Sequence, residues 1–94
     1  MRPERFVVPL VYIPPLLKSL TNGQEIVEVS GKNVREVIQA VEAIYPGFAA
    51  RICDGDDLRS GLAVTVGTKL ATNGLREVVD TDSEVHFLPA ISGG

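Results

Sequence analysis

The sequence contains one cysteine, one histidine and no tryptophan. The single cysteine, Cys53, excludes an internal disulfide and a CxxC motif. Together with His86 it supplies too few sulfur and nitrogen ligands for a zinc centre. The acidic string at Asp54, Asp56 and Asp57 lacks the remaining ligand positions of a calcium loop, including its distant glutamate. The sequence therefore predicts no bound metal, a solvated acidic loop and a packing role for Cys53.

Excess positive charge and long apolar runs are also missing. The sequence has nine Lys and Arg residues and twelve Asp and Glu residues, which gives a formal net charge of -3 and a pI near 5.0. Nucleic acids and anionic membranes attract clustered Lys and Arg, so we expect the chain to bind neither. No apolar run approaches the ~20 residues of a membrane span, and residues 1–5 do not resemble a signal peptide. We expect a cytoplasmic protein.

What the sequence does contain is enough apolar material for one small domain. It has 94 residues, of which 45% are hydrophobic, and this length leaves no room for a second core. Residues 6–13 are rich in Val, Leu and aromatic side chains and predict a strand inside the sheet. Because Pro9 cannot donate a ladder hydrogen bond, either pairing begins near Leu10 or Pro9 faces away from a neighbouring strand. Residues 24–29 alternate and predict a second, antiparallel strand.

The clearest predicted element is a helix over residues 34–45. Asn33 can cap its start, with Glu36 three residues later as in a capping box. A stripe at helical spacing is expected to face the core; its members are Val34, Val37, Ile38, Val41 and Ile44. After Pro46, the spacing of Phe48 and Ile52 predicts a short second helix. We also expect Leu16, Leu17 and Leu20 to cover one end of the core.

The second half of the sequence predicts a return to strands. Residues 62–66 alternate, Gly67 and Thr68 suit a turn into a short strand at 69–71, and residues 84–88 predict the last strand. A second turn signal, Asn73-Gly74, leaves the register between 62 and 80 open. Leu75, Val78 and Val79 are expected to pack under the sheet. This order predicts an α+β roll with a mixed sheet of four to five strands, in which the last strand lies beside the first.

The most informative feature is the Gly93-Gly94 ending. Without Cβ atoms, glycines can enter a narrow channel and adopt backbone angles that other residues avoid. The α-carboxylate of Gly94 is ionised and unreactive at neutral pH, so another enzyme would have to activate it, for example as an acyl-adenylate. We therefore divide the chain into a domain at 1–88 and a flexible tail at 89–94. In this interpretation Gly94 reacts, while Ile91, Ser92 and Gly93 enter the active site of a partner.

A partner that orders this tail needs a docking surface elsewhere on the domain. Ordering five residues costs roughly 5–10 kcal/mol of backbone entropy. If Val85 and Phe87 face the core, His86 and Leu88 face outward on the last strand, next to Pro89 at its exit. We assign partner docking to His86, Leu88 and Pro89. We find no nucleophile that His86 could activate, so we interpret His86 as a half-exposed strand residue and not as a catalyst.

Several segments together resemble the ubiquitin-like β-grasp sulfur carriers. These carriers include the small subunit of molybdopterin synthase, the thiamine sulfur carrier and the carriers of cysteine biosynthesis. The resemblance extends over nearly the whole chain and is closest to the cysteine type. It lies in FLPAISGG at 87–94, IPPLL at 13–17, TNGQ at 21–24 and the helix that starts with VREVI at 34–38. Residues 61–68 depart from the usual Phe-Val-Asn strand and Asn-Gly turn, so the pathway is left open.

The resemblance implies a β-grasp fold and a role as sulfur carrier. Gly94 would be adenylated by an ATP-using adenylyltransferase of the ubiquitin-activating type and converted to a thiocarboxylate. A sulfurtransferase or a sulfur-using synthase would be the other partner. The chain itself would hold no cofactor, since its glycines form no phosphate-binding pattern and ATP would be bound by the partner. We expect a monomer that docks transiently.

Two other functions remain open at the level of sequence. The same chemistry would let the chain act as a protein modifier, joined through Gly94 to lysines of other proteins. Alternatively, the domain could be a non-covalent binding module in which the Gly-Gly ending is incidental. Deleting Gly93 and Gly94 separates these, because only the non-covalent module would keep its function.

Overall fold

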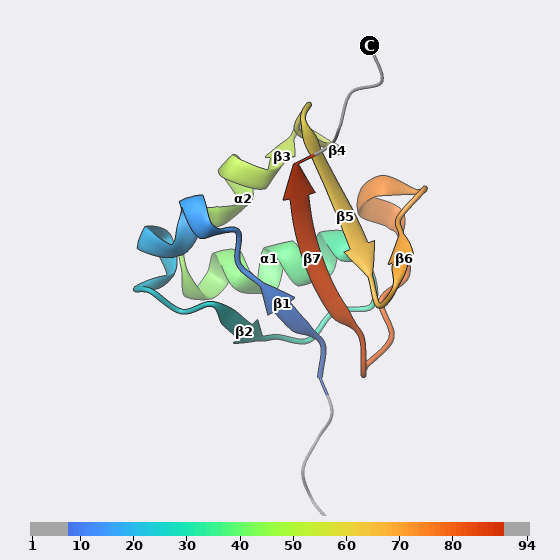
Figure 1. The fold of residues 1–94 in the computed structure, drawn as a ribbon, viewed down its shortest axis with the longest axis horizontal. Coiled ribbons are helices and arrows are strands. Elements are labelled where there is room, and N and C mark those ends of the chain that lie inside the picture. The colour runs from blue at the N-terminus through green and yellow to red at the C-terminus, as the bar shows by residue number, and fades with distance from the viewer. Residues whose placement is uncertain (1–7, 90–94) are drawn as a thin grey trace, which may run out of the picture.

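Five strands form one mixed sheet in the computed structural model, which describes residues 8–89 (Figure 1). The strand order is β2-β1-β7-β5-β6, and β1 runs parallel to β7 while the other neighbours are antiparallel. The strands are β1 (Leu10–Tyr12), β2 (Ile26–Glu28), β5 (Leu62–Val66), β6 (Lys69–Leu70) and β7 (Glu84–Pro89). The α+β roll is confirmed, with the first strand inside the sheet and the last strand beside it.

The position of Pro9 explains how a proline fits next to an inner strand. The ladder of β1 begins one residue later, at Leu10, as one of the two expected solutions requires. Pro9 takes part only as an acceptor, because its carbonyl receives a hydrogen bond from the backbone N–H of Val29 at 3.2 Å. The missing donor of the proline therefore removes no bond from the sheet.

The main helix, α1 (Val34–Ile44), lies across one face of the sheet (Figure 1). The Asn33 side chain accepts a hydrogen bond from the backbone N–H of Glu36 at 2.8 Å, as predicted for an N-cap. The first four residues of the predicted stripe are buried, but Ile44 is 53% exposed, so its assignment to the core was wrong. Ile44 follows Val34 by ten residues, and at 3.6 residues per turn the two side chains point about 80° apart around the helix axis. Ile44 therefore lies at the margin of the stripe, in the last turn of the helix.

Two short helices close one end of the core. In α2 (Phe48–Ile52), both terminal residues are fully buried, and Phe48 meets Phe87 edge to face at 6.1 Å. The 3-10 helix η1 (Pro15–Thr21) buries Leu17 and partly buries Leu20. Leu16 was wrongly expected in the core, since it is 91% exposed.

The acidic segment contains structure that the sequence did not predict. β3 (Cys53–Asp54) and β4 (Asp57–Leu58) form a two-stranded ribbon, with Gly55 at a φ of 63° in its turn.

The 3-10 helix η2 (Gly74–Arg76) places Leu75 in the core. Val79 is also buried, but Val78 is 67% exposed, contrary to expectation. The segment is extended here, with Val78 bridged to Asn33, so consecutive side chains point in opposite directions.

Gly31 allows the chain to pass close to the first turn of α1. A Cβ at this position would lie 2.7 Å from the backbone nitrogen of Val37 and 2.8 Å from its Cγ2. We therefore expect Gly31→Ala to lower the free energy of unfolding by about 1–3 kcal/mol, the usual cost of overpacking. Urea denaturation measures the change, with Ser30→Ala at the exposed neighbouring position as a control that stays within about 0.5 kcal/mol. Equal stability of the two variants would contradict the prediction.

The Glu42 carboxylate fixes the junction between α1 and α2. Its oxygens accept hydrogen bonds from the backbone N–H groups of Ala49 at 2.8 Å and Gly47 at 3.1 Å, and these bonds lower the pKa of Glu42. Because the pKa of Glu42 is lower in the folded state, its ionised carboxylate stabilises the fold at any pH above the pKa of the carboxyl in the unfolded chain. This stabilisation is lost as the pH falls through the pKa of the carboxyl in the folded protein. We expect Glu42→Gln to lower the urea midpoint at pH 7 and the deficit to shrink towards pH 3. A deficit as large at pH 3 as at pH 7 would contradict this, and Glu28→Gln serves as the exposed control.

Candidate functional site

Strand β7 leads to the predicted tail and is held on both sides. It pairs with β1 at residues 84–86 and with β5 at residues 85–89, so that Pro89 is the register partner of Leu62. The strand thus runs one residue beyond its predicted end at Leu88. The residues assigned to reaction and to entry into a partner are Gly94, Gly93, Ser92 and Ile91, and all of them lie outside the described residues 8–89. The structure therefore places Pro89, the last described residue, after which these residues follow in the chain.

The orientation of side chains along β7 agrees with the prediction. Val85 and Phe87 are buried against the helices, with exposed fractions of 0% and 5%. His86 is half-buried and Leu88 is 41% exposed on the opposite side of the sheet. Two of the three predicted docking residues, His86 and Leu88, thus lie on the sheet face that the helices leave uncovered (Figure 1). Pro89 is exposed at the end of the strand.

His86 belongs to a continuous row of side chains across all five strands. Each member of the row is the register partner of the next, so all lie on the same face. From one edge of the sheet to the other the row consists of Ile26, Tyr12, His86, Thr65 and Leu70. We call this row, together with Leu88, the outer sheet face. Ile26 and Leu70 at its two ends are 43% and 59% exposed.

The centre of the outer sheet face is an aromatic stack. The rings of Tyr12 and His86 are nearly parallel, with centroids 4.1 Å apart. Nε2 of His86 lies 3.3 Å from Oε1 of Glu84, which orients the imidazole. Partial burial, with a smaller contribution from the Glu84 carboxylate, raises the pKa of Tyr12. The face thus presents an amphipathic aromatic centre of the kind found in protein interfaces.

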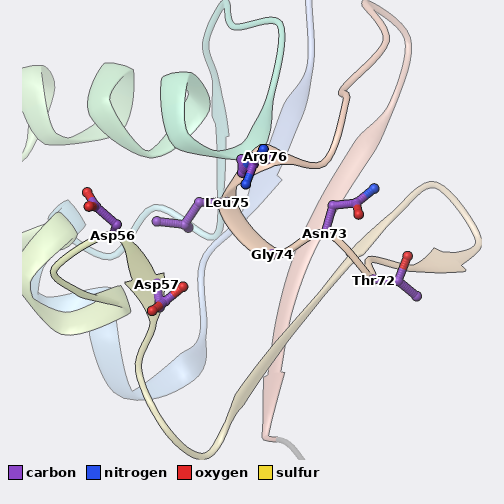
Figure 2. Close-up of a pocket in the computed structure, with 7 residues that line it drawn as sticks. All are labelled: Asp56, Asp57, Thr72, Asn73, Gly74, Leu75 and Arg76. Carbon is purple, nitrogen blue, oxygen red and sulfur yellow. The ribbon is translucent and has the colours of Figure 1, made fainter.

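A polar pocket of about 610 Å³ lies between the acidic turn and η2 (Figure 2). In Figure 2, Leu75 points from η2 towards Asp56, whereas Thr72 and Asn73 point away from the acidic turn. The Asp56 carboxylate pairs with Arg35 at 3.1 Å. Within residues 8–89 no group of acidic, cysteine and histidine side chains could hold a metal ion. The calcium reading of this turn thus gains no support from the structure.

Cys53 shows the features of a packing residue. Its side chain is partly buried against the core, and burial raises the pKa of its thiol, with Arg35 opposing the effect weakly. Because the thiolate is the nucleophilic form, a raised pKa makes this cysteine a poor sulfur acceptor at neutral pH.

Comparison with known proteins assigns the chain to a family. Residues 11–94 match the ThiS family. The match starts at Val11, the second residue of β1, and includes all later strands of the sheet and the Gly-Gly ending. The chain belongs to the ThiS family. It is 32% identical over 89 residues to the sulfur carrier protein CysO of Mycobacterium tuberculosis, an alignment that covers 89% of this chain and 96% of that protein. The resemblance predicted from the sequence is thereby confirmed.

Solved structures of ThiS-like proteins confirm the β-grasp fold. CysO in the BexX/CysO complex of Amycolatopsis orientalis superposes with a TM-score of 0.84 at 31% identity, covering 93% of this chain and all of that chain. CysO of Mycobacterium tuberculosis gives a TM-score of 0.80 at 30% identity, with 88% and 99% of the two chains covered. Urm1 of Trypanosoma brucei gives a TM-score of 0.70 at 21% identity and covers 97% of this chain and 99% of that chain, which is a likeness of fold alone.

No helix in the described part of this ThiS-family chain is long and apolar enough to cross a membrane.

Sequence reasoning missed part of the outer sheet face. It identified His86 and Leu88 from the alternation within one strand but not Tyr12, Ile26 or Leu70, which other strands contribute. The alternation of residues 24–29 placed Ile26 on the face opposite Val27 and Val29, but residues 6–13 are apolar on both faces and gave no such signal for Tyr12. Joining these residues to His86 required the pairing register between strands that are distant in sequence, which the pattern within one strand does not reveal.

Proposed function

We propose that this ThiS-family protein is a sulfur carrier in which the carboxylate of Gly94 holds the sulfur. The observation that carries the proposal is the family match through residue 94, together with the near-full-length similarity to a sulfur carrier protein. Gly93, Ser92 and Ile91 form the segment that enters the active site of the partner. The chain acts as a substrate and carrier and supplies no catalytic group of its own.

The chemistry takes place at the C-terminal carboxyl group of Gly94, in two steps. The Gly94 carboxylate attacks the α-phosphorus of ATP in the partner's site, which gives an acyl-adenylate and releases pyrophosphate. A hydrosulfide ion then attacks the acyl carbon, AMP leaves with the bonding electron pair, and a proton is released as the thiocarboxylate forms. An ionised thiocarboxylate is a soft nucleophile, much like a thiolate, so a second enzyme can consume it.

The outer sheet face supplies the docking surface for the activating partner. It combines exposed aliphatic side chains with an aromatic stack, and it adjoins Pro89, where the tail begins. Burial of such groups provides the free energy that offsets ordering of the tail. That CysO of Amycolatopsis orientalis forms a complex with BexX supports the idea that a domain of this shape associates with protein partners.

Intact mass spectrometry tests the proposal directly. The protein is incubated with ATP, hydrosulfide and an adenylyltransferase of the ubiquitin-activating type from the same genome. We expect a species heavier by the difference between one sulfur and one oxygen atom, with the increment located on the last peptide after digestion. A reaction without ATP is the control. No increment with any such adenylyltransferase would overturn the proposal, and adducts on lysines of other proteins would show a modifier instead.

A further inference from the structure

A second surface adjoins the exit of β7, on the helix side of the sheet. It is a groove of about 250 Å³ between η1, α2 and the start of β5. Its apolar lining includes Leu16, Leu17, Ile52 and Leu62. Leu16 is 91% exposed, which is unusual for a leucine and leaves its whole side chain open to a ligand. Leu62, at the rim, is the register partner of Pro89, so the groove begins about one strand spacing, ~5 Å, from the start of the tail.

Two arginines give this groove a charge opposite to that of the domain. Arg51 and Arg59 are exposed in its lining, and no acidic residue lines it, although the net charge of the chain is -3. Within residues 8–89 neither arginine forms an ion pair. Nη1 of Arg59 lies 3.4 Å from the carbonyl oxygen of Ala50, which places it along α2, the helix that carries Arg51. The groove therefore fits a ligand with an aliphatic group followed by an anion.

We propose that this groove binds the protein's own C-terminal segment, residues 90–94, with Ile91 against the leucines and the Gly94 carboxylate against Arg51 and Arg59. The inference rests on the proposed function, in which Gly94 carries a free carboxylate. Val85 and Phe87 face the helices, and the two-residue period of a strand places Ile91 on that side too if the extended backbone continues. Five residues span up to ~17 Å, which is ample for a groove that begins beside Pro89.

Attachment to the domain makes such binding effective even if each contact is weak. A short tether gives the segment an effective concentration in the millimolar range at the groove. A tail held there would be less accessible to other proteins, and a docking partner would have to displace it. Because the outer sheet face lies on the opposite side of the sheet, the partner can dock there first while the tail still occupies the groove.

Methyl-detected NMR of the full chain tests this without any partner enzyme. We expect nuclear Overhauser contacts between the Ile91 methyl groups and those of Leu16 and Leu62. We also expect Arg51→Glu combined with Arg59→Glu to reduce these contacts severalfold and to bring the amide relaxation of Gly93 and Gly94 to that of a free chain end. Arg76→Glu, an exposed arginine outside the groove, is the matched control and should leave both signals unchanged.

The proposal is overturned if the wild-type protein shows no Ile91 contacts with the groove, or if the tail relaxes equally fast in the wild type and the double variant. Far-ultraviolet circular dichroism confirms that the double variant is folded. This test and the sulfur-charging experiment fail independently. A tail that is charged with sulfur but makes no groove contacts refutes only the groove, whereas groove contacts without charging refute only the carrier function.

Discussion

Adding one alanine after Gly94 is expected to abolish sulfur charging, with a rate loss of more than about 100-fold. The extra residue moves the reacting carboxylate by up to 3.8 Å and adds a methyl group where the chain otherwise carries two residues without a Cβ. A displacement of 1 Å at a reacting centre can already cost about 100-fold. The rate of appearance of the sulfur-containing species in intact mass spectra measures the effect.

The matched control for this variant carries the same alanine before Met1, far from the reacting group in sequence. It should be charged at the wild-type rate, and both variants should unfold at the same urea concentration. If the chain extended at Gly94 is charged as fast as the wild type, the Gly94 carboxylate is not the acceptor of sulfur.

Replacing Leu88 with glutamate is expected to weaken binding to the activating enzyme by about 30-fold. A hot-spot residue near the centre of an interface contributes about 2 kcal/mol or more, and a charge in its place would be desolvated without a partner. Because Leu88 is 41% exposed in the free protein, we expect little change in the free energy of unfolding. Isothermal titration calorimetry with the activating enzyme and urea denaturation provide the two measurements.

Val78→Glu is the control for this substitution. Val78 is also an exposed aliphatic residue, at 67%, but it lies outside the outer sheet face. Its replacement should leave the affinity within about twofold, the range of a peripheral charge effect. Equal losses for Leu88→Glu and Val78→Glu would mean that net charge, and not the outer sheet face, determines binding.

Strong periodicity made much of the fold predictable from the sequence. The Asn33 cap and the first four stripe residues of α1, the short helix at Phe48 and the alternation along β7 all agree with the prediction. These features are local, since they depend on the spacing of apolar side chains along one element. The order of these elements along the chain then predicted the α+β roll with the last strand beside the first, and the family resemblance implied the β-grasp fold.

The wrong predictions concern side chains whose burial depends on neighbouring elements and not on the pattern within their own element. Ile44 and Val78 carry apolar side chains that the core does not reach, and Leu16 lies on the open side of η1. The β3–β4 ribbon was missed because each of its strands has only two residues, too few for an alternating pattern. The outer sheet face depends on register between strands that are distant in sequence. Local reasoning therefore found His86 and Leu88 but not the surface to which they belong.

The central position of β7 has a mechanical consequence. A partner that draws the tail into its active site pulls on a strand that is bonded to β1 on one side and to β5 on the other. The β1 ladder runs parallel to the pull, so its bonds are loaded together in shear, and they do not open one after another as in a peeled hairpin. The pulling force is therefore shared between two neighbouring strands of the sheet.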